Sequence, residues 1–395
     1  MSFLMYNDIT GMSVSAPSGQ FQMTRPAISI RKTGSWTFGS PSVLMMFHRR
    51  SGTLDAELAA MNECMPHYYR ITQGHGQGAE LLMNAEAAFM QGNFSDAQIL
   101  LEQTYSTIAS NGQHNISLCC DFLATRLSLF QEGVTFVKNP EIKRKELLSL
   151  HNMMWLNIFD STYAYYYALI RMPEKIPALF KDHMLSTVSF LSPCRPMMEM
   201  IENQVFLSQK MYAKVIGRSE TLLPFCEKMH YELVSLHVQI QTAAAYAMLG
   251  KHHDARQLLQ KALGKAMPDG FLIPFVENYT YIKDVLSSIN SIASEPFTDR
   301  ILSLGSVYEQ HCLRLSSRNY RPEILNVLNS REAEIAALIT DRLSNREIAE
   351  KLFLSEGTVK QYVNQIYSKL MINGDTRTKR KQLAELISSI NKGLT

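Results

Sequence analysis

Three polar side chains near the C-terminus have the chemistry and spacing needed to read DNA bases. They are Lys360, Gln361 and Asn364. Lysine can donate to O6 and N7 of guanine, while glutamine and asparagine can pair bidentately with adenine in the major groove. Such contacts require a helix that presents these side chains together and buries its other side. A base-reading surface is therefore predicted here if the surrounding sequence forms such a helix.

Start signals for three short helices surround these residues. Asn329 is followed three residues later by Glu332, and Ser344 by Glu347, and both are capping-box pairs. Ser355 is a favourable N-cap residue for a third helix. The sequence therefore predicts helices at residues 330–341, 345–352 and 356–371.

The third predicted helix has a buried side and an exposed side. Its apolar residues recur at steps of 4, 3 and 4, as a core stripe does: Val359, Val363, Ile366 and Leu370. The opposite side carries the three base-reading candidates and, further along, Tyr367. Arg346 lies near the start of the second helix, where such a scaffold crosses the phosphate backbone. The first two helices have apolar faces of their own, formed by Ile335, Leu338, Ile339, Ile348, Ala349 and Leu352.

The charge balance changes along the chain. The whole chain has 39 basic and 36 acidic residues, and residues 321–395 alone hold 12 basic and 9 acidic ones, so the remainder is neutral. Within residues 351–381, seven bases stand against two acids. A local excess of positive charge is typical of a surface that binds a polyanion. Charge alone also allows an ordinary solvated helix surface.

The segment from residue 328 to 370 resembles the C-terminal domain of LuxR-type (FixJ/NarL-like) transcription regulators. The matching motifs are Leu328-Asn-Ser-Arg-Glu332, Ser344-Asn-Arg-Glu-Ile-Ala349, Ser355-Glu-Gly-Thr-Val-Lys360 and Ile366-Tyr-Ser-Lys-Leu370. The resemblance implies a four-helix helix-turn-helix domain in which Lys360, Gln361 and Asn364 contact bases. It also implies backbone contacts for Arg346, Thr358 and Lys369. The N-cap residue Ser355 completes the predicted DNA-binding set.

Two departures from the family pattern concern the joints between helices. Arg342 stands where the family usually has Gly, and the loop at residues 371–377 is two residues longer than usual. A non-Gly residue in a left-handed cap costs about 1 kcal/mol. After this loop the resemblance implies a fourth helix at residues 379–390, which carries dimer contacts in the family. Its apolar side would be formed by Leu383, Leu386, Ile387 and Ile390.

Upstream, a helical pattern repeats at intervals of about 40 residues. Small residues, a Gly and then Asp-Ala occur both at residues 85–97 and at residues 243–255. Stacked helix pairs produce such regularity because one pair cannot bury its own apolar face. The pattern resembles tetratricopeptide-like (TPR-like) repeats, and an irregular helical bundle is the alternative. The predicted joints between helices lie near residues 92, 133, 173, 210 and 250.

The predicted fold is therefore all-α, with a TPR-like helical-repeat solenoid followed by the four-helix LuxR-type domain. Three parts are expected: a partly ordered lead-in at residues 1–42, a sensor or interaction domain at 43–316 and the DNA-binding domain at 317–395. The repeats followed by this domain resemble the C-terminal part of MalT-like regulators. Those regulators carry a nucleotide-binding domain, whereas this chain lacks a G-x-x-x-x-G-K-[ST] motif, so no cofactor is predicted.

An aromatic stripe within the repeats has two interpretations. Trp155, Phe159, Tyr163 and Tyr166 follow each other at steps of 4, 4 and 3 residues, which places them on one helix face. A stripe of this kind usually belongs to the core. The alternative is an effector pocket on the concave face of the solenoid, where aromatic rings suit sugars, peptides or flat ligands.

Several function classes find no support in the sequence. The six cysteines form no C-x-x-C pair and no metal-ligand spacing, and no nucleophile–base set suggests an enzyme. No apolar run reaches the roughly 18 residues of a membrane span, and the N-terminus has no signal-peptide pattern. A cytoplasmic location without membrane attachment is therefore expected.

The function predicted from the sequence is a sequence-specific, DNA-binding transcription regulator. Its repeats would sense an unknown small-molecule or protein effector and control the DNA-binding domain. The expected partners are double-stranded DNA, a second copy of the chain as a homodimer on DNA, and RNA polymerase as a further candidate. The alternative is a helical-repeat scaffold for protein interaction in which DNA binding is secondary.

Overall fold

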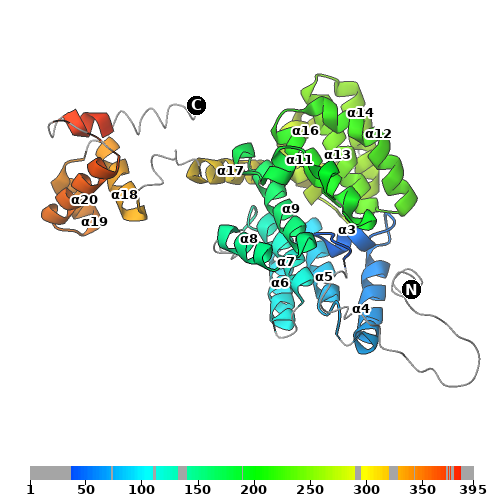
Figure 1. Ribbon diagram of the computed structural model, residues 1–395. Helices are drawn as coiled ribbons and strands as arrows, with labels where there is room; N and C mark the ends of the chain where they lie inside the picture. Colours follow the sequence, from blue (N-terminus) through cyan, green and yellow to red (C-terminus); the bar gives the residue numbers. More distant parts are fainter. Residues whose placement is uncertain are drawn as a thin grey trace, which may run out of the picture. The chain divides into compact units, whose positions relative to one another are not determined.

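The computed structural model describes residues 37–72, 74–109, 113–131, 140–188, 190–289, 295–319, 328–341, 343–370, 372, 374 and 378–383. These residues form helices and no β-strand, so the all-α prediction is confirmed (Figure 1). They divide into two compact units after Cys312. We call the first unit the helical array and the second unit the head.

The described residues in the N-terminal half of the helical array form seven helices. They are α3 (Val43–Phe47), α4 (Leu54–Ile71), α5 (Ala79–Met90), α6 (Phe94–Ile108), α7 (His114–Leu127), α8 (Pro140–Ser149) and α9 (Met153–Leu169). The helices that follow in the array are α10 (Ala178–Lys181), α11 (Arg195–Ser208), α12 (Tyr212–Met229), α13 (Glu232–Met248), α14 (His252–Ala266), α15 (Ile273–Val276) and α16 (Tyr279–Ser287). Helix α17 (Glu295–Asn319) begins in the array and continues past the boundary at Cys312. Short 3-10 turns join some of them: η2 (Pro173–Lys175), η3 (Leu185–Thr187), η4 (Ser192–Cys194) and η5 (Met267–Asp269).

Helical hairpins form at three of the predicted joints. The chain reverses between α5 and α6, between α11 and α12, and between α13 and α14. Gly92 and Gly250 have φ angles of 81° and 74°, the left-handed conformation that glycine adopts without cost. The predicted joint near residue 173 coincides with η2, and the one near residue 133 lies outside the described residues. A regular TPR-like solenoid remains a prediction.

Helix α13 is enclosed on all sides. It packs against α11, α12, α14 and α16, and every residue from Leu233 to Ala245 is buried. Three consecutive alanines near its end allow the neighbouring helices to approach closely. The buried polar side chain of Gln241 donates to the backbone oxygen of Met200 and to Oε1 of Gln204, both at 3.0 Å. This buried helix therefore still makes polar contacts with a neighbouring helix.

A buried ion pair connects the N-terminal half of the array to the end of α15. Glu277, at the end of α15, accepts hydrogen bonds from Arg126 of α7 at 2.8 and 3.1 Å and from the hydroxyl of Tyr165 of α9 at 2.8 Å. The guanidinium also lies over the rings of Phe89, Phe122 and Tyr165. The backbone N–H of Leu272 donates to the oxygen of Met90 at 2.8 Å nearby. Side chains far apart in the sequence therefore meet in the centre of the array.

The first described residues are part of this core. Thr37, Ser40 and Ser42 are buried, and so are the apolar residues of α3. The prediction of a partly ordered lead-in is therefore wrong for residues 37–42, because helices distant in sequence cover them. Residues 1–36 lie outside the described part of the chain.

The buried ion pair should make a large contribution to the stability of the array. We expect Arg126→Met to lower the free energy of unfolding by about 3–5 kcal/mol, because it leaves the carboxylate of Glu277 buried without its counter-charge. Arg126→Met combined with Glu277→Gln should recover part of the loss, since no unpaired charge remains. Urea unfolding followed by tryptophan fluorescence reports on the array, because residues 321–395 contain no tryptophan.

The exposed pair between Arg195 and Glu199 on α11 provides the control. Arg195→Ala should change the free energy of unfolding by no more than about 1 kcal/mol, because water screens this interaction. Equal losses for Arg126→Met and Arg195→Ala would contradict the central role of the buried pair.

The buried carboxyl group of Glu86 should give the array a pH-dependent stability. Burial raises the pKa of Glu86 from 4.5 to about 7, although hydrogen bonds from the Leu44 N–H and the Ser42 hydroxyl and the charge of Arg126 act in the opposite direction. The folded state therefore keeps a proton that the unfolded state releases, so stability should fall as the pH rises from about 4.5 to 7. We expect Glu86→Gln to flatten this dependence in urea unfolding between pH 5 and pH 7.5. Glu63→Gln, at an exposed position of α4, should leave it unchanged.

Candidate nucleic-acid interface

Local capping interactions define the helices of the head, which are α18 (Ser330–Thr340), α19 (Asn345–Leu352) and α20 (Glu356–Lys369). The two predicted capping boxes are present at Asn329 with Glu332 and at Ser344 with Glu347. The N–H and hydroxyl of Ser344 hold the pKa of Glu347 below its ordinary value. Ser355 caps α20 by accepting from the N–H of Thr358 at 3.0 Å. Each predicted helix therefore starts at the expected residue and ends within two residues of the expected one.

The apolar faces of the three helices meet in one core. Residues from all three predicted stripes are buried in it, and Leu352 and Leu370 pack against it. Leu383, which the family resemblance assigns to the dimer helix, is fully buried in the same core. Helical structure is described at residues 378–383, whereas Arg342, most of the loop after Leu370 and residues 384–395 lie outside the described residues. The buried cluster consists of Leu328, Ile335, Ala336, Leu338, Ile339, Ile348, Ala349, Val359, Val363, Ile366, Tyr367, Ile372 and Leu383.

The side of α20 opposite this core is open to solvent. Lys360, Gln361 and Asn364 are all exposed there, in the N-terminal half of the helix. We call these three residues the reading face. They can therefore reach base edges without any rearrangement of the head core.

The side chains predicted to contact the DNA backbone surround the starts of α19 and α20. Arg346 is 80% exposed and pairs loosely with Glu350 at 3.3 Å. Ser355 is exposed and Thr358 half-buried, and their hydroxyls are 2.8 Å apart. Free backbone N–H groups at helix starts attract phosphate. These positions suit contacts that orient a protein on DNA without reading its sequence.

Lys369 has a contact within the head. Its Nζ donates to the buried carboxylate of Glu332 at 2.8 Å and joins the end of α20 to the start of α18. The ammonium group is partly exposed and has two further protons, so the geometry still allows a phosphate contact. Its role at DNA remains a prediction.

Tyr367 is a correction to the predicted site. Only 5% of its surface is exposed, its ring belongs to the head core, and Lys379 lies 5.9 Å from the ring centre. Its hydroxyl is buried and has no hydrogen-bond partner among the described residues. Tyr367 follows Val363 by four residues, which places both on the same helix face. This spacing could have revealed the burial from the sequence.

Two arginines that the sequence analysis did not single out hold the head together. Arg380 donates to Oδ1 of Asn345 at 2.9 Å and also to the backbone oxygen of Leu343, just before α19. Arg331 donates to the oxygen of Leu352 at 2.8 Å and so caps the end of α19. Part of the positive charge counted in this region therefore serves the fold. Arg331 lies in the first turn of α18, but the backbone oxygen that it binds belongs to α19. No local sequence pattern predicts a contact between two helices of this kind.

The turn between α19 and α20 is made by Phe353. This residue has a φ angle of 54°, which is left-handed, and its side chain is 96% exposed. An exposed aromatic ring at this turn was not expected from the sequence. Nothing in the described part of the head explains why phenylalanine stands here.

The aromatic stripe of α9 is part of the core of the array, so the proposed effector pocket there is wrong. Trp155, Phe159 and Tyr163 are at most 8% exposed and pack with Leu118 and Leu147. Tyr166 is partly buried, and its ring contacts that of Tyr167 at a centroid distance of 5.3 Å. Helices α7, α8 and α11 pack against α9 and cover its faces. The 4-4-3 spacing therefore reflects burial between helices.

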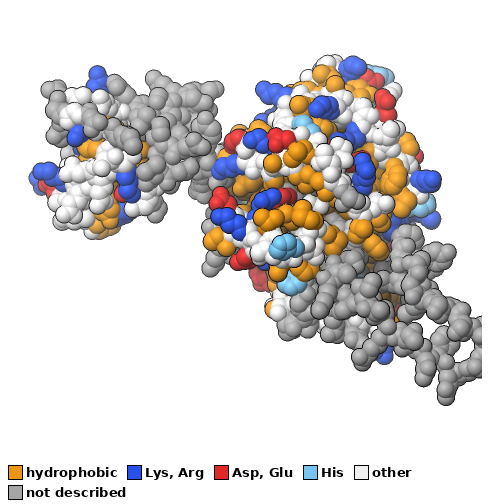
Figure 2. Space-filling model, in the orientation of Figure 1, with side chains coloured by type: hydrophobic (Ala, Val, Ile, Leu, Met, Phe, Trp, Pro, Cys, Tyr) orange, Lys and Arg blue, Asp and Glu red, His pale blue; other side chains and the backbone are white. Residues whose placement is uncertain are grey.

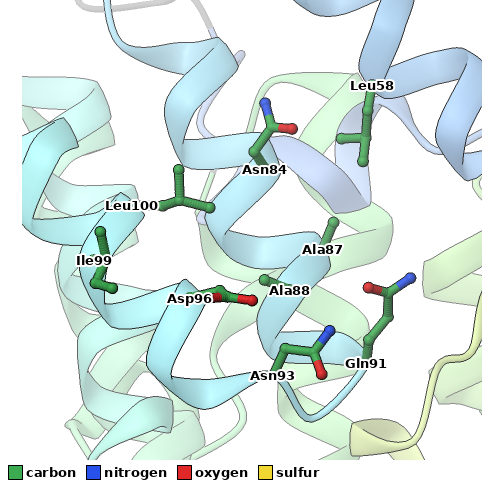
Figure 3. A pocket seen from close by; sticks show the side chains of 9 residues that line it. All are labelled: Leu58, Asn84, Ala87, Ala88, Gln91, Asn93, Asp96, Ile99 and Leu100. Atoms are coloured by element: carbon green, nitrogen blue, oxygen red, sulfur yellow. The ribbon is translucent and has the colours of Figure 1, made fainter.

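A surface hollow of about 420 Å³ lies elsewhere, between α4, α5 and α6 (Figure 3). The amide groups of Asn84 and Gln91 donate to neighbouring oxygen atoms, which leaves their own oxygens as acceptors. The carboxylate of Asp96 adds a further acceptor. The lining consists of Leu58, Asn84, Ala87, Ala88, Gln91, Asn93, Asp96, Ile99 and Leu100.

The surface of the array differs in charge from the region around α20. On the visible face of the array, basic and acidic side chains lie next to each other among apolar ones (Figure 2).

In the described ranges, no helix has the length and apolar character of a membrane span. The same residues contain no cluster of three His, Cys, Asp or Glu side chains that could hold a metal ion.

Three helices around one core, with an exposed third helix and a capped joint before it, define a helix-turn-helix domain. Residues 326–380 match the family model described as "Bacterial regulatory proteins, luxR family". The chain therefore carries a LuxR-type helix-turn-helix domain in its C-terminal part.

Three curated proteins are similar to a short part of this chain. It is 46% identical over 57 residues to the transcriptional regulatory protein LnrK of Bacillus subtilis (strain 168), which covers 14% of this chain and 26% of LnrK. It is 45% identical over 53 residues to DegU of Brevibacillus brevis, covering 13% and 22%, and 36% identical over 75 residues to DesR of Bacillus subtilis (strain 168), covering 16% and 38%. The matches thus span less than two fifths of each relative. No solved structure gave a significant match.

The burial of Tyr367 yields a test that separates a core residue from a DNA contact. We expect Tyr367→Phe to leave DNA affinity unchanged and the stability of the head equal or higher, because it removes a buried hydroxyl that has no partner. Tyr367→Ala should destabilise the head by about 3–5 kcal/mol through the cavity it creates. Hydrogen exchange of the α18–α20 amides measures head stability. A loss of DNA affinity in a stable Tyr367→Phe variant would restore the tyrosine to the interface.

Proposed function

We propose that the chain is a sequence-specific, DNA-binding transcription regulator that inserts α20 into the major groove. The single observation that best supports this proposal is the exposed reading face, formed by Lys360, Gln361 and Asn364, directly opposite a packed core stripe. These side chains combine donors for guanine with amides for adenine. The family match and the relatives named as transcriptional regulatory proteins point in the same direction.

Phosphate contacts would orient the head while the reading face selects the sequence. Arg346, Ser355 and Thr358 flank the starts of α19 and α20, and Lys369 lies at the other end of α20. Contacts of this kind add affinity that does not depend on sequence and that falls with salt concentration. Substitutions of phosphate-contacting residues should therefore change the salt dependence of binding, whereas substitutions on the reading face should change the sequence preference.

The proposal extends to partners and control. Two heads of a symmetric homodimer would read half-sites about one helical turn apart. RNA polymerase is the proposed partner in transcription, and the cytoplasm is the proposed location. The helical array, which has its own core and an almost balanced surface charge, would receive an effector and control the heads.

Substitutions on the reading face should weaken specific binding strongly. On a duplex enriched from random sequences by the full chain, we expect Lys360→Ala or Asn364→Ala to cost about 1–3 kcal/mol of binding free energy and to relax the preference at one base pair. Arg346→Ala should weaken binding to all duplexes alike and reduce the salt dependence. Glu334→Ala, at an exposed position of α18, is the control and should leave affinity unchanged.

Two outcomes would contradict the proposal in different ways. Unchanged affinity in both reading-face variants would remove the assigned base contacts while leaving a DNA-binding role open. Failure of the full chain to enrich any sequence, with or without added metabolites, would instead favour an interaction scaffold.

A further inference from the structure

Residues 37–48 lie inside the helical array in the manner of a bound peptide. Helix α3 forms no hairpin with the helix that follows it in the sequence. It packs against α5 and α13, which are separated by more than 140 residues (Figure 1). We call residues 37–48 the inner segment. Its position is set by elements that come much later in the chain.

Three helices bind the backbone of the inner segment. The thiol of Cys119 on α7 donates to the oxygen of Ser40 at 3.3 Å. The N–H of Leu44 donates to the carboxylate of Glu86 on α5 at 2.6 Å. The N–H of Glu232, the first residue of α13, donates to the oxygen of His48 at 3.3 Å. Hydrogen bonds from the surrounding helices therefore pair with main-chain groups of the inner segment. Proteins that recognise a peptide bind its main chain in the same way.

Close packing adds selectivity along the inner segment. A Cβ atom on Gly39 would lie 3.3 Å from both Sγ of Cys194 and Cγ of Met154, and the φ angle of Gly39 is 85°. Val43, Leu44, Met45 and Met46 are at most 2% exposed. Flexible methionine side chains adapt readily to irregular apolar surroundings. The site therefore fits glycine at one point and a short apolar helix after it.

The site has polar groups that the inner segment does not use. Oε1 of Glu86 and Oδ1 of Asn115 are buried without a hydrogen-bond partner among the described residues. The other oxygen of Glu86 binds Leu44, and Nδ2 of Asn115 donates to the Thr37 hydroxyl at 2.7 Å. An unpartnered carboxyl oxygen and an unpartnered amide oxygen are costly in a core, and they suit a ligand that brings additional polar groups.

We propose that the interior of the array is a peptide-binding site whose resident ligand is the inner segment. A separate peptide with the same pattern, a glycine followed by Ser-Pro-Ser and a short apolar helix, takes its place. The connection to α4 is hydrogen-bonded, because the Ser51 hydroxyl donates to the oxygen of Lys265 at 2.6 Å and the N–H of Gly52 donates to the carboxylate of Asp269 at 2.7 Å. Arg50 is exposed, so the chain can be cut beside it to release the segment. This inference rests on the proposed function in one respect, because it identifies the effector of the array as a peptide.

The test measures peptide exchange in the full chain without DNA, so it can fail independently of the proposed function. A recognition site for a specific protease is inserted between Arg50 and Ser51, and the purified protein is cut there. A fluorescent peptide of residues 37–50 is then added, and its anisotropy reports binding. We expect saturable binding to the cut chain and at least tenfold weaker binding to the uncut chain, in which the tethered segment competes.

Matched variants locate the binding. Glu86→Ala in the cut chain should weaken peptide binding at least tenfold, while Glu63→Ala, an exposed acid on α4, should change it less than twofold. A peptide with Gly39→Ala should bind at least tenfold more weakly, because its Cβ is strained at a φ angle of 85° and presses on Cys194 and Met154. A peptide with Arg50→Ala should bind like the unmodified one. The peptide variants keep the test valid if Glu86→Ala does not fold.

Three results would overturn the inference. One is the absence of exchange over a day in a cut chain that keeps its far-UV circular dichroism. Another is loss of the helical signal when the N-terminal fragment leaves, which would make the inner segment an inseparable part of the core. The third is equal binding of the unmodified and Gly39→Ala peptides, which would place the peptide elsewhere on the protein.

Discussion

The carboxylate of Glu277 in the centre of the array is the constraint on which most of the fold depends. It accepts from Arg126 and Tyr165, which lie on two helices more than 100 residues earlier in the chain. A guanidinium in so dry a place needs its partner, because an isolated charge there would be very costly. Stacked repeats usually contact only their neighbours and can gain or lose units at little cost. This array instead closes through a long-range ion pair, so we expect its helices to unfold as one unit.

The head follows the opposite principle. Its helices start at capping interactions that span three residues, and its core is formed within about 60 residues of chain. Almost all information needed to fold it is therefore local. Such a unit can keep its structure while the rest of a protein changes, which agrees with a family match that is confined to residues 326–380.

Local rules explain which features could be predicted from the sequence. The starts of α18, α19 and α20 followed from Asn329, Ser344 and Ser355, because capping needs only nearby residues. The core stripe of α20 followed from its period, and the same period places Tyr367 on the buried face four residues after Val363. The pairing of Arg126 with Glu277 joins residues 151 positions apart, and no periodic pattern reveals such a contact. The burial of residues 37–42 was missed for the same reason, since their partners lie on distant helices.

Burial of Tyr367 limits how much sequence information one head can extract. With this ring in the core, three side chains remain among those proposed to read bases, and each such contact is worth about 1–3 kcal/mol of discrimination. At about 2 kcal/mol each, they distinguish a site from a random one by roughly 10⁴-fold, whereas a genome offers about 10⁶ or more competing positions. A single head would therefore be outnumbered by chance matches. Two heads that bind together multiply their selectivities to roughly 10⁸-fold. Dimerisation would therefore decide whether one DNA site can be distinguished from all competing sites in a genome.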